Sequence, residues 1–165
     1  MMMEARGLKM SNIKDITGNY ALFCSLFAWL TAQIIKCVIA LITQKGFSVR
    51  NVLLASGGMP SSHSATVCAL CTSIGRTEGL QSPLFAIAVV FAFLVMYDAM
   101  GVRWSAGEQA KVINNLIKTQ PEHKPFDMNK ILKEKLGHKP LEVVVGAALG
   151  IMIAIVTQSI VLQPV

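Results

Sequence analysis

Long apolar stretches alternate with short polar segments along this chain, and their lengths predict membrane-spanning helices. Residues 20–43 contain only Gln33 and Lys36 as strongly polar positions. As a helix this segment would be about 36 Å long, enough to cross a bilayer. Residues 83–102 begin with a proline, which suits a helix start, and carry one charge, while residues 141–162 follow a His-Lys-Pro sequence. We predict a membrane-spanning helix over each range.

A weaker apolar segment, residues 60–78, lies between the first two spans and reads PSSHSATVCALCTSIGRTE. It is rich in Ser, Ala, Thr and Cys, so it is too weakly apolar to face lipid on all sides. Small residues let membrane helices approach closely, and we expect a short fourth helix buried among the other three. The predicted fold is an all-α integral membrane helical bundle of about four membrane helices.

Polar segments flank these helices. Residues 1–19 lack a long apolar run followed by a small-residue cleavage site, so we expect no cleaved signal peptide. Residues 103–140 form a polar loop that is expected to be partly helical, with an amphipathic helix over 107–118 and a short basic helix over 129–137. Because no linker or repeat divides the chain, we interpret residues 1–165 as a single membrane domain.

Composition agrees with a membrane protein. The chain is 53% hydrophobic and 15% charged, with a mean hydropathy of +0.56, whereas soluble domains are about 45–50% apolar. The net charge of +6 is explained by basic loops on the inner side of a membrane. The lipid bilayer is therefore an expected partner and nucleic acid is not.

The topology decides whether the polar residues form one site. If the short buried helix crosses the membrane, the segments before His63 and His138 lie on the same side. Lys36, about two turns from the end of the first span, and Arg103, at the end of the span over residues 83–102, point to that side as well. Four polar interruptions then converge on one membrane face. If the helix does not cross, the two histidines lie on opposite faces and share no site.

The sequence GGMPSSHSA places chemistry at the start of the buried helix. A helix beginning there directs its unpaired N–H groups and its positive dipole end toward Ser61, Ser62 and His63, a geometry that suits an anion. Gly57 and Gly58 allow close backbone approach, and the serine hydroxyls add donors for phosphate oxygens. The alternative is ordinary helix capping by serine, with the histidine bonded to a neighbouring carbonyl.

A second candidate lies at LGHKPLEVVVG, where His138 and Glu142 are four residues apart. At this spacing the two share a helix face, so the carboxylate can fix the tautomer and orientation of the imidazole, which would make it a nucleophile or a base. The alternative is a helix-start salt link. Cys68 and Cys71 form a C-x-x-C without a second Cys/His pair, so we expect packing there, no metal site and no cofactor.

Three blocks of the sequence resemble a known family in order: GGMPSSHSAT, YDAMGVRWSAGEQAKVIN and LKEKLGHKPLEVVVG. They are similar to the signature blocks of the divergent branch of the type 2 phosphatidic acid phosphatase family, small membrane proteins of bacteria and plastids. The sequence QIIK, ending at Lys36, is also similar to that branch. The resemblance covers nearly the whole chain from about residue 19 onward.

The resemblance implies a mechanism. In the wider superfamily, which includes lipid phosphate phosphatases and vanadium haloperoxidases, the last histidine attacks phosphorus, an acidic residue orients it, and the middle histidine protonates the leaving alcohol. Carried over by motif, these roles fall on His138, Glu142 and His63, while Lys36 holds the phosphate. Residues 60–63 match the second motif of the superfamily, which places Ser61 and Ser62 beside the substrate.

The chain departs from the superfamily pattern at several positions. Ser62 replaces a glycine, Glu142 replaces an aspartate, and Leu132 stands where a Ser-Arg pair is expected. Arg103 is the best substitute for the missing arginine. Asp98 lies one to two turns away from it, and since a carboxylate in a membrane helix is by default paired or functional, we expect an Asp98–Arg103 pair rather than a metal ligand.

Two functions follow. The first is a membrane-embedded phosphatase that hydrolyses a lipid phosphate monoester or pyrophosphate through a phosphohistidine. Phosphatidylglycerophosphate, prenyl pyrophosphate and phosphatidic acid are admissible substrates, with the first favoured by family association. The second is a membrane scaffold or lipid-binding member that kept the anion site without turnover, which the missing Ser-Arg pair favours.

Charge and small residues suggest orientation and assembly. Ten Lys and Arg residues fall on the side of the candidate site and four on the other, so we expect the site to face the cytoplasm of a bacterium. We also expect self-association through GAALG, residues 146–150, with contact inside one chain as the alternative.

Overall fold

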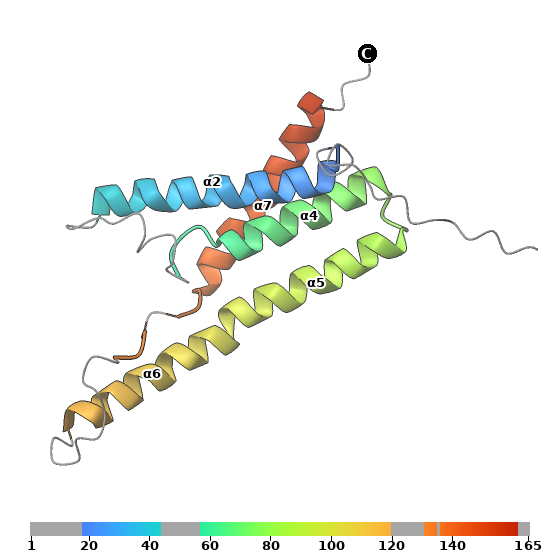
Figure 1. The fold of residues 1–165 in the computed structure, drawn as a ribbon. Coiled ribbons are helices and arrows are strands. Elements are labelled where there is room, and N and C mark those ends of the chain that lie inside the picture. Colours follow the sequence, from blue (N-terminus) through green and yellow to red (C-terminus); the bar gives the residue numbers. More distant parts are fainter. Residues whose placement is uncertain (1–17, 44–56, 120–130, 135, 162–165) are drawn as a thin grey trace, which may run out of the picture.

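The computed structural model describes residues 18–43, 57–119, 131–134 and 136–161, and these contain helices and no strands. The helices are α2 (Tyr20–Thr43), α4 (Ser62–Thr77), α5 (Pro83–Met100), α6 (Val102–Thr119) and α7 (Pro140–Val161) (Figure 1). The predicted all-α membrane bundle is confirmed. The spans expected over 20–43, 83–102 and 141–162 appear as α2, α5 and α7 with boundaries shifted by at most two residues.

Polar side chains set several of these helix starts. Asn19 accepts a hydrogen bond from the backbone N–H of Leu22 at 3.0 Å, which fixes the first turn of α2. Ser82 accepts from the N–H of Leu84 at 3.2 Å, directly before the proline that opens α5. Serine before proline is a strong helix start because the side chain satisfies a free N–H and proline has none to satisfy.

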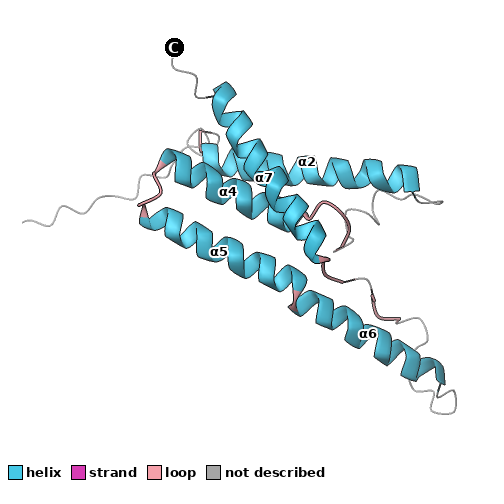
Figure 2. Cartoon of the chain, turned by 180° about the vertical axis from the view of Figure 1, so that it is seen from behind, coloured by secondary structure: helices cyan, strands magenta, loops and turns pink. Residues whose placement is uncertain are grey.

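The direction of the helices alternates across the bundle. Helices α2 and α5 run toward the end at which α4 and α7 begin, and α4 lies in contact with α2, α5 and α7 (Figures 1 and 2). Three helical stretches are long and apolar enough to span a membrane: Tyr20–Thr43, Pro83–Thr119 and Pro140–Ile160. Helix α4 has 16 residues and is the short, small-residue helix that the sequence places among them.

Small residues form the contact between α4 and its neighbours. Ala65 and Ala69 of α4 pack with Ala28 and Ala32 of α2, and all four are fully buried. On the other side a side chain at Gly150 would run into the backbone of Ala65, because a Cβ there would lie 2.9 Å from the Ala65 carbonyl carbon. Close helix contact in membranes depends on such residues.

The GAALG segment was expected to form a contact between two copies of the chain. The structure shows instead that it forms a contact within one chain. Gly146 packs on the backbone of Ser61 and Gly150 on that of Ala65, so the two glycines serve the contact between α7 and α4 within one chain. The alternative interpretation holds for this face. Self-association through another surface stays a prediction.

Replacing Gly150 by alanine should destabilise the fold, because the added methyl group forces α7 away from α4. Overpacking of this kind costs about 1–3 kcal/mol. Thermal unfolding of the purified protein in detergent measures the loss. Ala148→Leu is the control, since Ala148 is exposed on the same helix; an equal effect of both changes would contradict the packing assigned to Gly150.

The loop after α5 differs from its prediction. The amphipathic helix is longer than expected and starts at Val102, so that α6 continues the line of α5 (Figure 2). We expected a basic helix over 129–137. Of this range the structure describes residues 131–134 and 136–137, which are not helical, so the prediction is wrong for these residues. The side chain of Asn114 explains this: it donates to the Leu132 carbonyl at 2.9 Å and accepts from the Leu132 N–H at 3.1 Å. These bonds replace those of a helix.

Candidate active site

The two histidines predicted to act together lie side by side. His63 is in the first turn of α4 and His138 lies two residues before α7. Their ring centroids are 5.7 Å apart and the rings meet edge to face, at 67°. The expected convergence on one end of the bundle is therefore present, because α4 and α7 begin at the same end, toward which α2 and α5 run (Figure 1).

Backbone contacts hold His138 in place. Its N–H donates to the carbonyl of Ala99 near the end of α5 at 2.9 Å. Gly137, with φ of +82°, packs on the backbone of Arg103 and Trp104, where a Cβ would come within 2.5 Å of the Trp104 nitrogen. Only glycine tolerates both this conformation and this proximity. His138 is thus fixed to the junction of α5 and α6.

Glu142 orients the imidazole of His138. Its Oε2 lies 3.0 Å from Nδ1 of the histidine, whose side chain is fully buried. The other ring nitrogen, Nε2, is buried without a hydrogen-bond partner. A neutral imidazole that donates from Nδ1 to a carboxylate keeps its lone pair on Nε2. The expected pair is present, and the nitrogen it leaves free is the one suited to attack.

Positive charge lies next to the histidines. Lys36 is 5% exposed, and its Nζ donates to the Ser62 hydroxyl at 3.4 Å. Burial lowers the pKa of His138, the hydrogen bond to Glu142 opposes this, and the charges of Lys36 and Arg103 lower the pKa further. His138 is therefore neutral at pH 7, the protonation state that a nucleophile requires.

The Asp98–Arg103 pair expected from the sequence is present. Nε of Arg103 donates to Oδ2 of Asp98 at 2.7 Å, and both side chains are about half exposed. Leu132, which stands at the position of the missing Ser-Arg pair, is exposed and bonded through its backbone to Asn114. Arg103 is therefore the arginine beside this site in the described part of the chain.

Ser61 and the glycine loop before His63 make contacts that shape the local fold. Ser61 is fully buried and caps α4, accepting from the N–H of Ser64 at 3.3 Å, and its own N–H donates to the backbone carbonyl of Glu142 at 3.0 Å. The capping alternative thus describes Ser61. Gly58 has φ of +95°, and a Cβ at Gly57 would lie 3.2 Å from the Gly137 carbonyl, so this loop reaches the His138 segment.

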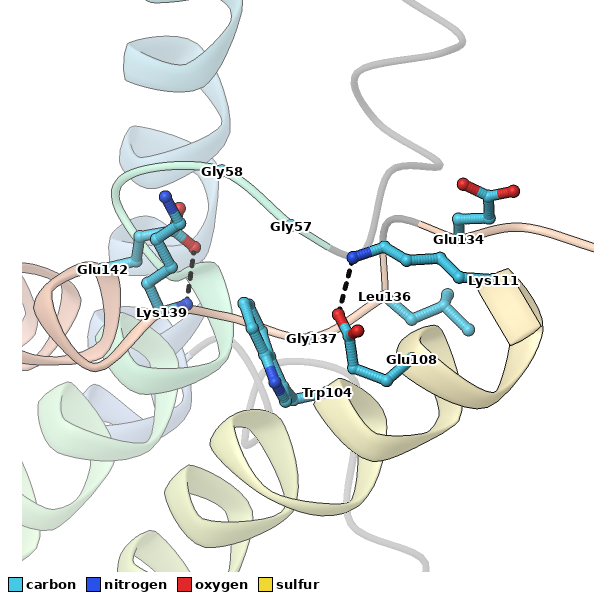
Figure 3. A pocket seen from close by; sticks show the side chains of 10 residues that line it. All are labelled: Gly57, Gly58, Trp104, Glu108, Lys111, Glu134, Leu136, Gly137, Lys139 and Glu142. Atoms are coloured by element: carbon cyan, nitrogen blue, oxygen red, sulfur yellow. Dashed lines mark hydrogen bonds and ion pairs between the residues drawn. The ribbon is translucent and has the colours of Figure 1, made fainter. Parts of the chain in front are cut away.

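A cavity of about 490 Å³ opens beside Glu142, the hydrogen-bond partner of His138 (Figure 3). Glu142 lines it and connects it to His138. Glu108 and Lys111 of α6 face it as an ion pair of 2.6 Å. The remaining lining residues are Gly57, Gly58, Trp104, Glu134, Leu136, Gly137 and Lys139. The amphipathic pattern of α6 predicts a polar face, and Glu108 and Lys111 show that part of this face lines the cavity.

Among the described residues, no group of three His, Cys, Asp or Glu side chains is placed to hold a metal ion. The cysteines at 24, 37, 68 and 71 are free thiols. Cys68 is buried against α5, near the sulfur of Met96. This is the packing role expected of the C-x-x-C.

Comparison with known proteins shows the family of the chain. The model of the divergent PAP2 family matches residues 17–153, a range that includes both histidines, Lys36 and Glu142. The chain belongs to this family. It is 41% identical over 152 residues to the uncharacterized membrane protein YuiD of Bacillus subtilis (strain 168), covering 86% of this chain and 96% of that relative. No solved structure matches the chain. The chain is thus an integral membrane protein of the divergent PAP2 family. The description of its relative names no activity.

Proposed function

We propose that this protein is a phosphatase that hydrolyses a lipid phosphate through a phosphohistidine intermediate. The observation that carries the proposal is the orientation of His138. Nδ1 of this residue is held by Glu142 at 3.0 Å, Nε2 has no partner, and His63 lies beside it. An oriented nucleophile, here His138, with a second titratable group nearby, here His63, is the arrangement that nucleophilic catalysis uses.

The reaction proceeds in two steps. Nε2 of His138 attacks phosphorus and forms the N–P bond while the P–O bond to the lipid alcohol breaks, and His63 gives its proton to the leaving oxygen. Water then attacks phosphorus and gives a proton to His63, the N–P bond breaks and returns its electron pair to Nε2 of His138, and inorganic phosphate leaves. One residue serves as acid and then as base, as microscopic reversibility requires.

Cations stabilise the phosphoryl oxygens. Lys36 and Arg103 supply two positive charges, and the hydroxyl of Ser62 and the backbone at Gly58 add donors. Phosphoryl transfer depends mainly on such positioning and charge stabilisation, which act most strongly where water is excluded. Asp98 positions Arg103 through its ion pair.

The substrate is a phosphorylated lipid because the site lies at the end of membrane-spanning helices. Phosphatidylglycerophosphate, phosphatidic acid and prenyl pyrophosphate form the panel to test, in that order. The purified protein should release inorganic phosphate from at least one of them in detergent micelles. His138→Ala protein, prepared in parallel, should release none.

A non-catalytic lipid-binding member is the second candidate. The observation that favours it is that Arg103 is paired with Asp98 and half exposed, so the phosphate clamp of the superfamily is altered. Tight binding of phosphorylated lipid without phosphate release from any member of the panel would support this candidate.

The pH dependence of turnover follows from His138. Because its pKa is lowered from the ordinary value of 6.5, the neutral nucleophile persists below that pH, and the acid limb of kcat should fall below pH 6.5. Glu142 raises this pKa, so Glu142→Gln should move the acid limb to lower pH as well as slowing the reaction. A pH-rate profile from pH 4.5 to 8 checks both. An acid limb that moves to higher pH in the variant would contradict the assignment.

We further propose that the site faces the cytoplasm of a bacterial cell, on the basis of the ten basic residues on its side. A cysteine replacing Lys118, at the exposed end of α6, should stay unlabelled by an impermeant maleimide added to intact cells. A cysteine replacing Glu78, exposed at the opposite end of α4, should label and is the control. The reverse pattern would overturn this orientation.

A further inference from the structure

Gln33 is a buried polar residue in the apolar part of α2 that has no role in the mechanism above. It is 8% exposed, and its Oε1 is buried without a hydrogen-bond partner. Among the described residues, three side-chain N or O atoms are buried without a hydrogen-bond partner: Oε1 of Gln33, Nδ1 of His63 and Nε2 of His138. The other two belong to the proposed phosphate site.

An unpaired amide inside a membrane protein is costly. Burial of such a group without a partner is unfavourable, and lipid offers no water as a substitute. Other polar side chains on α2 are satisfied, for example Ser25, which donates to the carbonyl of Ala21 at 2.7 Å, and Thr31, which donates to that of Phe27 at 2.9 Å. Among the described side chains of α2, Gln33 is therefore the one with a buried polar atom that the fold leaves unpaired.

The position of Gln33 relates it to the phosphate site. It lies three residues before Lys36 on the buried face of α2, hence about 4.5 Å deeper along the helix axis. Because α2 runs toward the site, Gln33 lies on the membrane-interior side of the lysine. In a phosphorylated lipid held at Lys36, this is the side on which the lipid part of the molecule continues.

We propose that Gln33 is a specificity-determining residue that hydrogen-bonds a glycerol oxygen of the substrate next to its phosphate. The side-chain amide carries both a donor and an acceptor, so it pairs with a hydroxyl or an ester oxygen. A lipid whose phosphate is attached to plain hydrocarbon leaves the amide unpaired. The inference rests on the proposed function for its substrate class and selects glycerolipid phosphates over alkyl or prenyl phosphates.

The test compares two phosphate monoesters of primary alcohols, dioctanoyl phosphatidic acid and dodecyl phosphate. Gln33→Met keeps the length of the side chain and removes the amide. Loss of one neutral hydrogen bond, about 1 kcal/mol, should lower kcat/KM for phosphatidic acid about fivefold and leave dodecyl phosphate unchanged. Thr31→Val, on the same helix, is the control and should change neither.

Stability separates this role from a structural one. Because Oε1 of Gln33 has no hydrogen-bond partner among the described residues, Gln33→Met should unfold at the same or a higher temperature than the wild type. A lower unfolding temperature together with an equal loss of kcat/KM on both substrates would show that Gln33 supports the fold, and would overturn the inference.

Binding distinguishes failure of the inference from failure of the proposed function. The dissociation constants of the same two lipids are measured on His138→Ala and on the Gln33→Met/His138→Ala double variant, where no turnover is needed. A preference for phosphatidic acid that the double variant loses supports the role of Gln33 even if the wild type releases no phosphate. Turnover by the wild type with no such preference retains the phosphatase and removes the role of Gln33.

Discussion

Replacing His138 by alanine is expected to lower the rate of phosphate release from lipid substrate by about 10⁴-fold or more, because the variant has no nucleophile. The alanine side chain cannot form the N–P bond, and His63, the other histidine of the site, lacks a carboxylate partner at hydrogen-bond distance among the described residues. The main-chain bond from residue 138 to the Ala99 carbonyl is unaffected, so the site should keep its shape. Phosphate release from the purified variant measures the loss.

The control for this change is His123→Ala, which removes the third histidine of the sequence. His123 has no part in the proposed mechanism, and its variant should retain the wild-type rate. If His138→Ala retained more than about a tenth of the wild-type activity, an effect too small for loss of a nucleophile, the assignment would fail.

Replacing His63 by alanine is expected to produce a loss that depends on the leaving group. For an alkyl phosphate the departing alkoxide needs a proton, and loss of the general acid should slow the reaction by about 10²–10⁴-fold. For p-nitrophenyl phosphate the departing phenolate needs none, so formation of the phosphoenzyme should slow by less than about threefold. The position of His63 in the first turn of α4 supports this role, because a phosphate bound there favours the protonated imidazole.

Rapid-quench measurement of phosphoenzyme formation with both substrates tests the role of His63. Lys36→Met serves as a comparison, because loss of a phosphate-binding cation should slow both substrates to a similar degree. Equal losses on the two substrates in His63→Ala would show that His63 binds phosphate rather than donating a proton.

Much of the fold follows from local sequence pattern. Apolar runs of membrane length define α2, α5 and α7, and the prolines at 83 and 140 mark where two of them begin. The His138–Glu142 and Asp98–Arg103 pairs could be predicted because partners four or five residues apart meet across a helix turn or a helix junction.

Features that depend on contacts between distant segments could not be predicted. The basic segment has helix-forming residues, yet in its described part the side chain of Asn114 binds the backbone at Leu132, and residues 131–134 are not helical. Gly137 is required by the backbone of Trp104, and Gly150 by that of Ala65. A glycine in the sequence does not reveal which neighbour approaches it, so the sequence could not decide between contact inside one chain and contact between chains for the GAALG face.

The most direct test of the central claim is to trap and map the covalent intermediate. The protein is mixed with lipid substrate carrying radioactive phosphate, quenched in alkali within the first turnover, and digested into peptides. The account predicts an acid-labile, alkali-stable phosphohistidine on the peptide that contains His138, and its absence in His138→Ala. Phosphate release by the wild type without any labelled peptide, or label on the peptide that contains His63, would contradict it.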